Sequence, residues 1–401
     1  MYFVPYSAQS TKRGVAPVKK RRNQQKDQSK IFTIHNKSDK PDHLVLQEHK
    51  VIERALEIEK SLPCFMNDFF LYLKNAVAVS TRLAYLEDIH FFCQYLVEET
   101  ELTRASTTRE IALNEFSNIQ ARDINYFLGQ YCQRYVIQDE KANRIMENHQ
   151  RSLARKKSSL SVLFKNLYRD GLLAINITDG FNPIQLPKPQ PDAIKRLDID
   201  EVVRLLEIVD TGDHLSPKEK IYWEKTRLRD RAILVLFLTY GLRVNELAQL
   251  NISSFNFHRG EFRIFRKRGK ESLMPINHSC ERVVREYLNQ ERPESGTLDS
   301  EHQDALFLSL QRKRMTIRSI RNLVKKYTAL VLGTAAGDGY SPHKLRATAA
   351  TSLIQQGASI FDVQNLLDHD NVTTTQLYAA HRKDAKREVI KNFEWLDDQG
   401  E

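Results

Sequence analysis

The stretch Leu-Leu-Asp-His-Asp-Asn-Val-Thr-Thr-Thr-Gln-Leu-Tyr-Ala-Ala (366–380) places Tyr378 nine residues after His369. Two other stretches precede it, Thr-Tyr-Gly-Leu-Arg-Val-Asn-Glu-Leu-Ala-Gln-Leu (239–250) and Ser-Pro-His-Lys-Leu-Arg-Ala-Thr-Ala-Ala-Thr (341–351). Together they supply a phenol, two histidines and two arginines in a fixed order. This set suits attack on a phosphodiester, because the phenol is a nucleophile and the cations stabilise the extra negative charge of the transition state.

Each part alone also has an ordinary structural interpretation. His343 and Arg346 lie three residues apart and would share one helix face, but a surface pair would look the same. Arg243 follows a glycine after an apolar run, where an arginine is often a helix cap, although its guanidinium also matches a phosphate. Tyr378 alone is most simply a packed aromatic. The order and spacing of the whole set therefore carry the functional prediction.

The three stretches resemble those of the tyrosine recombinase (phage integrase) family, most closely the bacterial Xer-type site-specific recombinases. The resemblance covers about residues 60 to 395. It implies a mainly α fold with a small antiparallel β-sheet, divided into a helical SAM-like core-binding domain and a tyrosine recombinase catalytic domain that clamp duplex DNA. The implied activity is site-specific DNA recombination through a 3′-phosphotyrosine intermediate.

The resemblance also assigns roles residue by residue. Arg243 and Arg346 would neutralise the non-bridging oxygens of the scissile phosphate. His343 would act in proton transfer from the tyrosine, and His369 would hydrogen-bond the phosphate. Tyr378 would be the nucleophile that becomes the phosphotyrosine.

A lysine and an acid complete the implied set. Lys267 lies in Phe-Arg-Lys-Arg-Gly-Lys-Glu-Ser-Leu-Met-Pro-Ile (265–276) and would protonate the departing 5′ oxygen. Its neighbours Arg268 and Lys270 leave that assignment open. Glu246 would support the first arginine structurally rather than chemically.

The sequence predicts no metal and no cofactor. A phosphotyrosine stores the energy of the broken bond, so ATP is not required, and the chain has no Gly-x-x-x-x-Gly-Lys-Ser/Thr loop. No acidic cluster is typical of a two-metal nuclease. One departure from the family pattern is Ala347, where many relatives have a second histidine. That position is outside the chemical set, so it affects the subtype more than the activity.

Composition indicates a polyanionic partner, double-stranded DNA first. The 401 residues carry a net charge of +10 and the sequence pI is about 9.2, although a merely basic soluble protein would show the same values. The widely spaced cysteines argue against a zinc site or disulfides and favour a reducing compartment; they are Cys64, Cys93, Cys132 and Cys280. Without a membrane-length apolar run or a signal peptide, we expect a cytoplasmic protein with no membrane partner.

Charge and periodicity divide the chain into five parts. We predict a basic, disordered arm that could add phosphate contacts (1–45), a helical core-binding, DNA-binding domain (46–182), a proline-rich linker (183–195), a catalytic domain (196–383) and a C-terminal helix for subunit contact (384–401).

Two helices are predicted in the core-binding domain. One begins after an N-cap at Ser80 or Thr81 and buries the stripe Tyr85, Ile89, Phe92 and Leu96. The other runs from about Asn148 to Arg169 and buries Leu160, Leu163, Phe164 and Leu167. Its basic start either faces DNA, which we favour, or forms an ordinary solvated face; it comprises Arg151, Arg155, Lys156 and Lys157.

The catalytic domain should begin with a helix near Asp198, followed by a buried helix from Asp230 to Tyr240 that Gly241 ends. Alternation between Phe255 and Ile276 predicts the small antiparallel sheet. Further helices are expected at Cys280, at Thr316, after His343 and from Ser359, whose Asp362 completes a cap signal.

Several alternatives remain open at this stage. The recombinase could serve mobile-element integration and excision, which the basic arm favours slightly, or chromosome-dimer resolution. A catalytically silent DNA-binding protein of the same fold and a type IB topoisomerase-like activity are the other candidates. Because strand exchange needs four cleavages, a recombinase should act as a tetramer on two DNA sites. An accessory directionality factor would be a further partner.

Overall fold

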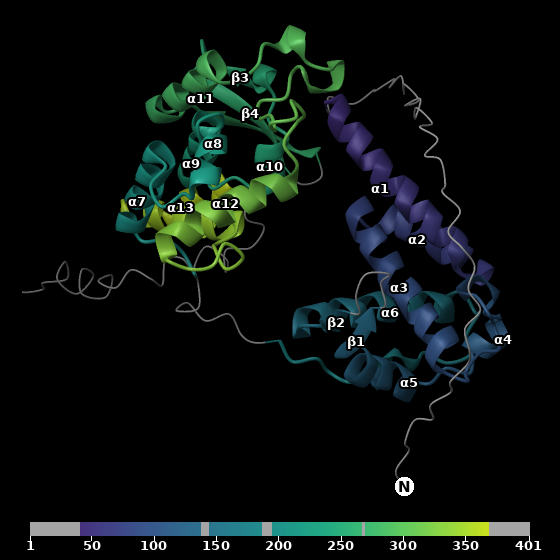
Figure 1. Ribbon diagram of the computed structural model, residues 1–401. Helices are drawn as coiled ribbons and strands as arrows, with labels where there is room; N and C mark the ends of the chain where they lie inside the picture. Colours follow the sequence, from purple (N-terminus) through teal and green to yellow (C-terminus); the bar gives the residue numbers. More distant parts are fainter. Residues whose placement is uncertain (1–40, 138–143, 187–194, 267–268, 369–401) are drawn as a thin grey trace, which may run out of the picture.

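The computed structural model describes residues 41–137, 144–186, 195–266 and 269–368. They form two lobes, each around its own main hydrophobic core (Figure 1). We call residues 41–186 the N-terminal lobe and residues 195–368 the C-terminal lobe. Most elements are helices and the sheets are small and antiparallel, which confirms the predicted fold class.

The N-terminal lobe is built mainly from helices. Its helices are α1 (Asp42–Ser61), α2 (Asn67–Ala76), α3 (Val79–Glu99), α4 (Leu113–Phe116), α5 (Ala121–Tyr126) and α6 (Gln150–Arg169). A two-stranded hairpin of β1 (Arg134–Ile137) and β2 (Arg144–Glu147) interrupts them. The sequence did not predict this hairpin, because each strand has only 4 residues and the hairpin lies between two helical patterns.

The predicted apolar stripes lie in the core of this lobe. Ile89, Phe92 and Leu96 of α3 are fully buried or nearly so, and so are the four predicted residues of α6. Two boundaries differ from expectation. Helix α3 is capped at Ala78, so Ser80 and Thr81 lie inside its first turn. Helix α1 begins at Asp42, inside the segment predicted as an arm.

The C-terminal lobe packs helices against one face of a three-stranded sheet. The helices are α7 (Ile199–Thr211), α8 (Pro217–Trp223), α9 (Arg227–Tyr240), α10 (Val244–Ala248), α11 (His278–Gln290), α12 (Ile317–Leu332), α13 (Pro342–Gln355) and α14 (Ile360–Leu367). The sheet has the order β3 (Phe255–Asn256), β4 (Glu261–Phe265), β5 (Glu271–Pro275). The sheet and helices α7, α9, α11, α12, α13 and α14 agree with the sequence prediction to within a few residues, whereas the short helices α8 and α10 were not predicted.

Local signals explain where these elements start and stop. Asp198 caps α7 in a capping box with Glu201, and the side chain of Ser359 accepts a hydrogen bond from the backbone of Asp362 at the start of α14. Phe262 and Ile264 of β4 point into the core. Tyr240 at the end of α9 donates its hydroxyl proton to the carbonyl of Pro275, 2.8 Å away, and so fixes the hairpin against this helix.

Candidate active site

The turn after α9 brings the first arginine to the site. Gly241 has φ +57°, a left-handed conformation that ends the helix and that other residues rarely adopt. A Cβ built on Gly241 would lie 2.6 Å from the Leu367 side chain, so the glycine also permits the close approach of α14. Arg243, two residues later, is the N-cap of α10.

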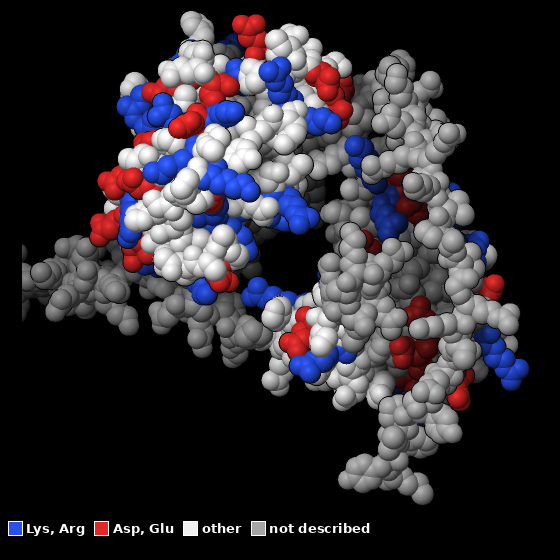
Figure 2. Space-filling model, in the orientation of Figure 1, with Lys and Arg blue, Asp and Glu red and all other residues white. Residues whose placement is uncertain are grey.

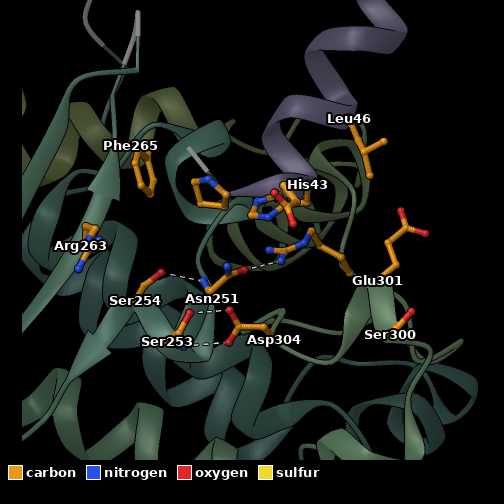
Figure 3. A pocket seen from close by; sticks show the side chains of 13 residues that line it. His43, Leu46, Asn251, Ser253, Ser254, Arg263, Phe265, Ser300, Glu301 and Asp304 are labelled. Atoms are coloured by element: carbon orange, nitrogen blue, oxygen red, sulfur yellow. Dashed lines mark hydrogen bonds between the residues drawn. The ribbon is translucent and has the colours of Figure 1, made fainter. Parts of the chain in front are cut away.

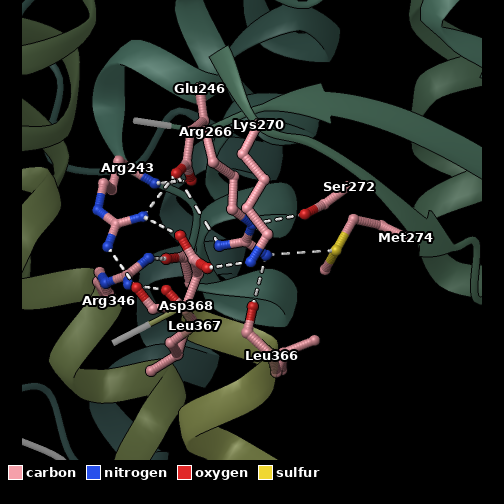
Figure 4. A network of polar contacts seen from close by, with 11 residues as sticks. Arg243, Glu246, Arg266, Lys270, Ser272, Met274, Arg346, Leu366, Leu367 and Asp368 are labelled. Atoms are coloured by element: carbon pink, nitrogen blue, oxygen red, sulfur yellow. Dashed lines mark hydrogen bonds and ion pairs between the residues drawn. The ribbon is translucent and has the colours of Figure 1, made fainter. Parts of the chain in front are cut away.

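Glu246 holds both ends of Arg243. One carboxylate oxygen accepts the backbone N–H of Arg243 at 2.7 Å, and the other accepts a guanidinium N–H at 2.8 Å. Glu246 is buried, whereas about a third of the Arg243 side chain, 37%, is exposed. The other terminal nitrogen of the Arg243 guanidinium, Nη2, donates to the backbone carbonyl of Asp368 at 2.8 Å (Figure 4). A charge-assisted pair of this kind fixes the orientation of the guanidinium plane.

The second arginine meets the same chain segment from α13. Arg346 is buried and donates to the carbonyl of Gly241 at 2.6 Å and to the carbonyl of Leu367 (Figure 4). Arg243 and Arg346 therefore contact the consecutive carbonyls of Asp368 and Leu367 at the end of α14. Two guanidinium groups at one point make a strongly cationic site, as an anionic ligand requires.

Asp368 places a carboxylate in this cationic site. Its Oδ1 accepts a hydrogen bond from Lys270 at 3.1 Å, and its Oδ2 lies 3.8 Å from the Arg243 guanidinium. Partial burial on its own raises the pKa of Asp368, but the hydrogen bond from Lys270 and the charges of Arg266 and Arg243 outweigh it, so the net pKa is lowered. Asp368 has φ +50°, an unusual backbone conformation for a residue with a side chain.

His343 lies on α13, three residues before Arg346. Although part of its surface is exposed, the surrounding protein desolvates the ring, and this lowers the pKa of His343 below its ordinary value of 6.5. The positive charges of Lys344, Arg346 and Arg243 lower it further. A neutral imidazole can accept a proton.

Sequence reasoning overlooked Arg266, the residue that follows β4. Its guanidinium is buried behind Glu246 and donates to the carbonyl of Leu366 at 2.7 Å (Figure 4). A signal was available, because Arg266 continues the inward alternation of Phe262 and Ile264 and so had to be buried. Asp368 was also overlooked, although it directly precedes His369 in the sequence.

Three of the predicted site residues, Lys267, His369 and Tyr378, lie outside the described residues. Lys267 directly follows Arg266, and His369 directly follows Asp368. Both neighbours belong to the network of Figure 4. The structure thus brings together Arg243, Glu246 and Arg346, and the charges of the two arginines help to lower the pKa of His343.

The basic start of α6 is partly engaged within the N-terminal lobe. The Lys156 ammonium is buried, 3.1 Å from Asp88 and over the ring of Phe91. Arg155 pairs with the same Asp88 but stays partly exposed. Lys157 donates to two carbonyls near residue 182, and Arg151 is exposed. The burial of Lys156 gives it an internal role, so DNA contact by this stretch remains a prediction that rests on Arg151, Arg155 and Lys157.

Helix α1 reaches from its own lobe to the other. It packs along α3, and its first turn faces the C-terminal lobe across a hollow of about 790 Å³ (Figure 3). His43 stands in this hollow near Asn251 and Arg314. Burial, and secondly the charge of Arg314, lower the pKa of His43 to about 4, so the imidazole is neutral at ordinary pH. The start of α1 and the C-terminal lobe therefore line this hollow together.

Charge on the surface follows the opening between the lobes. Figure 2 shows Lys and Arg side chains along the edge of the C-terminal lobe that faces this opening.

Within the described ranges, no cluster of His, Cys, Asp and Glu could hold a metal ion. No described helix is both long and apolar enough to cross a membrane.

Comparison with known proteins identifies similar chains. Residues 195–385 match the model of the phage integrase family. The chain is 28% identical to the tyrosine recombinase XerD of Listeria monocytogenes over 328 residues, 81% of this chain and 95% of that protein. It is 34% identical to the tyrosine recombinase XerC of Natranaerobius thermophilus, over 73% of this chain and 89% of that protein.

A solved structure has the same fold. The crystal structure of the XerH site-specific recombinase bound to its difH substrate, a pre-cleavage complex, matches with a TM-score of 0.55 and 20% sequence identity. The match covers 88% of this chain and 90% of that one. At this identity the likeness establishes the shared fold.

Proposed function

Because the chain belongs to the phage integrase family of tyrosine recombinases, we propose that it is an enzyme that catalyses site-specific recombination of double-stranded DNA. The similarity to proteins named tyrosine recombinases spans both lobes and nearly the full length of those relatives. The cationic site between α10, α13 and α14 supports this reaction class, since the reaction develops negative charge on a phosphate.

The proposed cleavage step is a transesterification. The phenolic oxygen of Tyr378 attacks the scissile phosphorus, and its proton passes to the neutral imidazole of His343. A P–O bond forms to Tyr378 while the bond from phosphorus to the 5′ oxygen breaks, and Lys267 supplies the proton that the leaving oxygen needs. Arg243, Arg346 and His369 hold the non-bridging oxygens. Religation reverses these steps with a 5′ hydroxyl of the partner strand.

The observation that carries this proposal is the meeting of Arg243 and Arg346 at one point of the chain. Both guanidinium groups donate to the end of α14, on residues 367 and 368. The described residues therefore end, at Leu367 and Asp368, in contact with the two groups that would hold the phosphate, and His369 is the next residue in the sequence. A surface pair or a helix cap would not explain that convergence of two distant segments.

The partner we propose is duplex DNA held between the lobes, with four copies of the chain in the exchanging complex. Each exchange breaks four strands, and each break uses one tyrosine. The segment 384–401 lies outside the described residues. In its sequence, Ala385, Val389, Phe393 and Leu396 are spaced so that, in a helix, they would line one apolar face suited to contact with a neighbouring copy. Deleting 384–401 should leave binding to a single half-site intact and abolish cooperative binding to paired half-sites in a gel-shift titration.

The direct test of the activity is a nicked suicide substrate analysed on a denaturing gel. The natural chain should form a covalent protein–DNA adduct, and Tyr378→Phe should bind the same DNA with unchanged affinity but form none. An adduct that persists in Tyr378→Phe would exclude this tyrosine as the nucleophile. Binding without any adduct in the natural chain would identify a silent DNA-binding protein. Relaxation of supercoiled DNA of any sequence, without strand exchange, would identify a topoisomerase.

A further inference from the structure

Arg266 is a buried cation near the site that has several polar contacts but no role in the proposed reaction. It follows β4 at an inward position, and only 3% of its side chain is exposed. Burying a charged group is costly unless it is paired and hydrogen-bonded, so its partners must be strong. A leucine or methionine would fill the same inward position of the hairpin without that cost.

Its contacts join three elements. Arg266 Nη2 donates to the carbonyl of Leu366 on α14 at 2.7 Å, and Nε donates to the hydroxyl of Ser272 on β5 at 3.1 Å. Its Nη1 lies 4.0 Å from the Glu246 carboxylate oxygen that also accepts from Arg243. One guanidinium thus ties the β4–β5 hairpin to the end of α14 and to the carboxylate behind Arg243.

Each of these elements leads to a residue of the proposed reaction. The residue after Arg266 is Lys267, and Leu366 precedes His369 by three positions. The planar fork of an arginine can fix two directions at once, which a lysine cannot do. We propose that Arg266 is a positioning residue that holds the hairpin carrying Lys267 at a fixed place relative to α14. This inference rests on the proposed function.

A matched control separates positioning from simple core stability. Arg292 is another buried arginine of the same lobe, with 9% of its surface exposed. Its guanidinium donates to the carbonyls of Gln303 and Ala305 instead. Arg266→Lys and Arg292→Lys both keep the charge and both lose the fork, so each should lower the melting temperature of the full chain.

The experiment measures single-turnover cleavage of the suicide substrate, together with DNA affinity and melting temperature, for the two variants. At a temperature where both are folded, Arg266→Lys should reduce the cleavage rate constant about 10- to 100-fold, as a small misplacement of a reacting group does, with DNA affinity unchanged. Arg292→Lys should cleave at the natural rate. Equal cleavage rates in the two variants would overturn the inference.

A second substrate tests the route through Lys267. With sulfur in place of the bridging 5′ oxygen, the leaving group needs no proton. The loss of cleavage rate in Arg266→Lys should therefore largely disappear on this substrate. A deficit of the same size on both substrates would show that Arg266 does not act through Lys267. If the natural chain forms no covalent adduct at all, the proposed function fails; if it does and only the Arg266→Lys results disagree, the inference alone fails.

Discussion

The guanidinium of Arg243 donates a 2.8 Å hydrogen bond to the backbone carbonyl of Asp368, across 125 positions of sequence. The bond connects the start of α10 to the residue that directly precedes His369. A change at one end therefore alters the geometry at the other, and the arginine serves the structure of the site as well as its charge.

Arg243→Ala should affect cleavage far more than binding. The charge that Arg243 would stabilise is largest in the transition state, so we expect a loss of about 10² to 10³ in the cleavage rate constant and little change in DNA affinity. Single-turnover cleavage and a filter-binding titration measure the two effects. Arg285→Ala, at an exposed arginine of α11 that pairs with Glu281, is the control and should change neither. A proportionate loss of binding and cleavage would make Arg243 a DNA-positioning group only.

A substrate with a 5′-bridging phosphorothiolate should distinguish the roles of Lys267 and Lys270. Lys267→Ala should slow cleavage of ordinary DNA about 10²- to 10⁴-fold, the usual contribution of a general acid, and cleave the sulfur substrate at nearly the natural rate. Lys270 is held by Asp368 at 3.1 Å, so Lys270→Ala should have a smaller effect that sulfur does not correct. Recovery of Lys270→Ala and not of Lys267→Ala would exchange the two assignments.

The cleavage rate should persist at unusually low pH for a reaction that uses a histidine base. A base must be neutral, and a lowered pKa keeps His343 neutral below its ordinary value of 6.5. The rate constant should therefore stay level as pH falls towards 6.5 and decline only at a lower pH. Second-order rate constants, measured with the protein well below saturation by DNA, report the pKa of the free protein and give the midpoint across this range. In His343→Gln the overall rate should drop and this acidic decline should vanish. A decline centred at or above 6.5, or one that survives in the variant, contradicts the assignment.

Removing residues 1–40 should weaken DNA binding and its dependence on salt. This segment contains eight basic residues between positions 12 and 30, namely Lys12, Arg13, Lys19, Lys20, Arg21, Arg22, Lys26 and Lys30. Each phosphate contact that is lost should make the slope of log K against log salt shallower by about 0.9. Titrations at several salt concentrations give the slope. An identical slope for the shortened chain would mean that the arm does not touch DNA.

Most elements of the C-terminal lobe were predictable because they have strong local signals, whereas the short helices α8 and α10 were not predicted. Gly241 ends an apolar helix, Ser359 and Asp362 mark a cap, and Phe262 and Ile264 alternate along a strand. The N-cap of α3 was not, since Ser80 and Thr81 are good capping residues that the helix simply passes through. The short strands β1 and β2 carry too few residues to show a period of two.

The candidate site was predictable in its residue types but not in its connections. The motif spacing singled out Arg243 and Arg346, whereas their shared contact with the end of α14 depends on how three distant segments pack. Lys156 shows the same dependence on packing between distant segments. Its charge predicted an exposed DNA contact, but Asp88 on α3 supplies an internal partner that no local pattern of α6 announces.

Asp368 means that this site already contains an anion before any DNA arrives. Its carboxylate contacts Lys270 and Arg243, and Arg243 is one of the cations that would hold the phosphate. Docking of a phosphate is then an exchange of one anion for another, and only part of the attraction between the arginines and the phosphate appears as binding energy. The carboxylate must yield, by turning away or by accepting a proton, before the cations can close on the DNA. Occupation of the site by DNA and loss of the contact between Lys270 and Asp368 are therefore a single linked event.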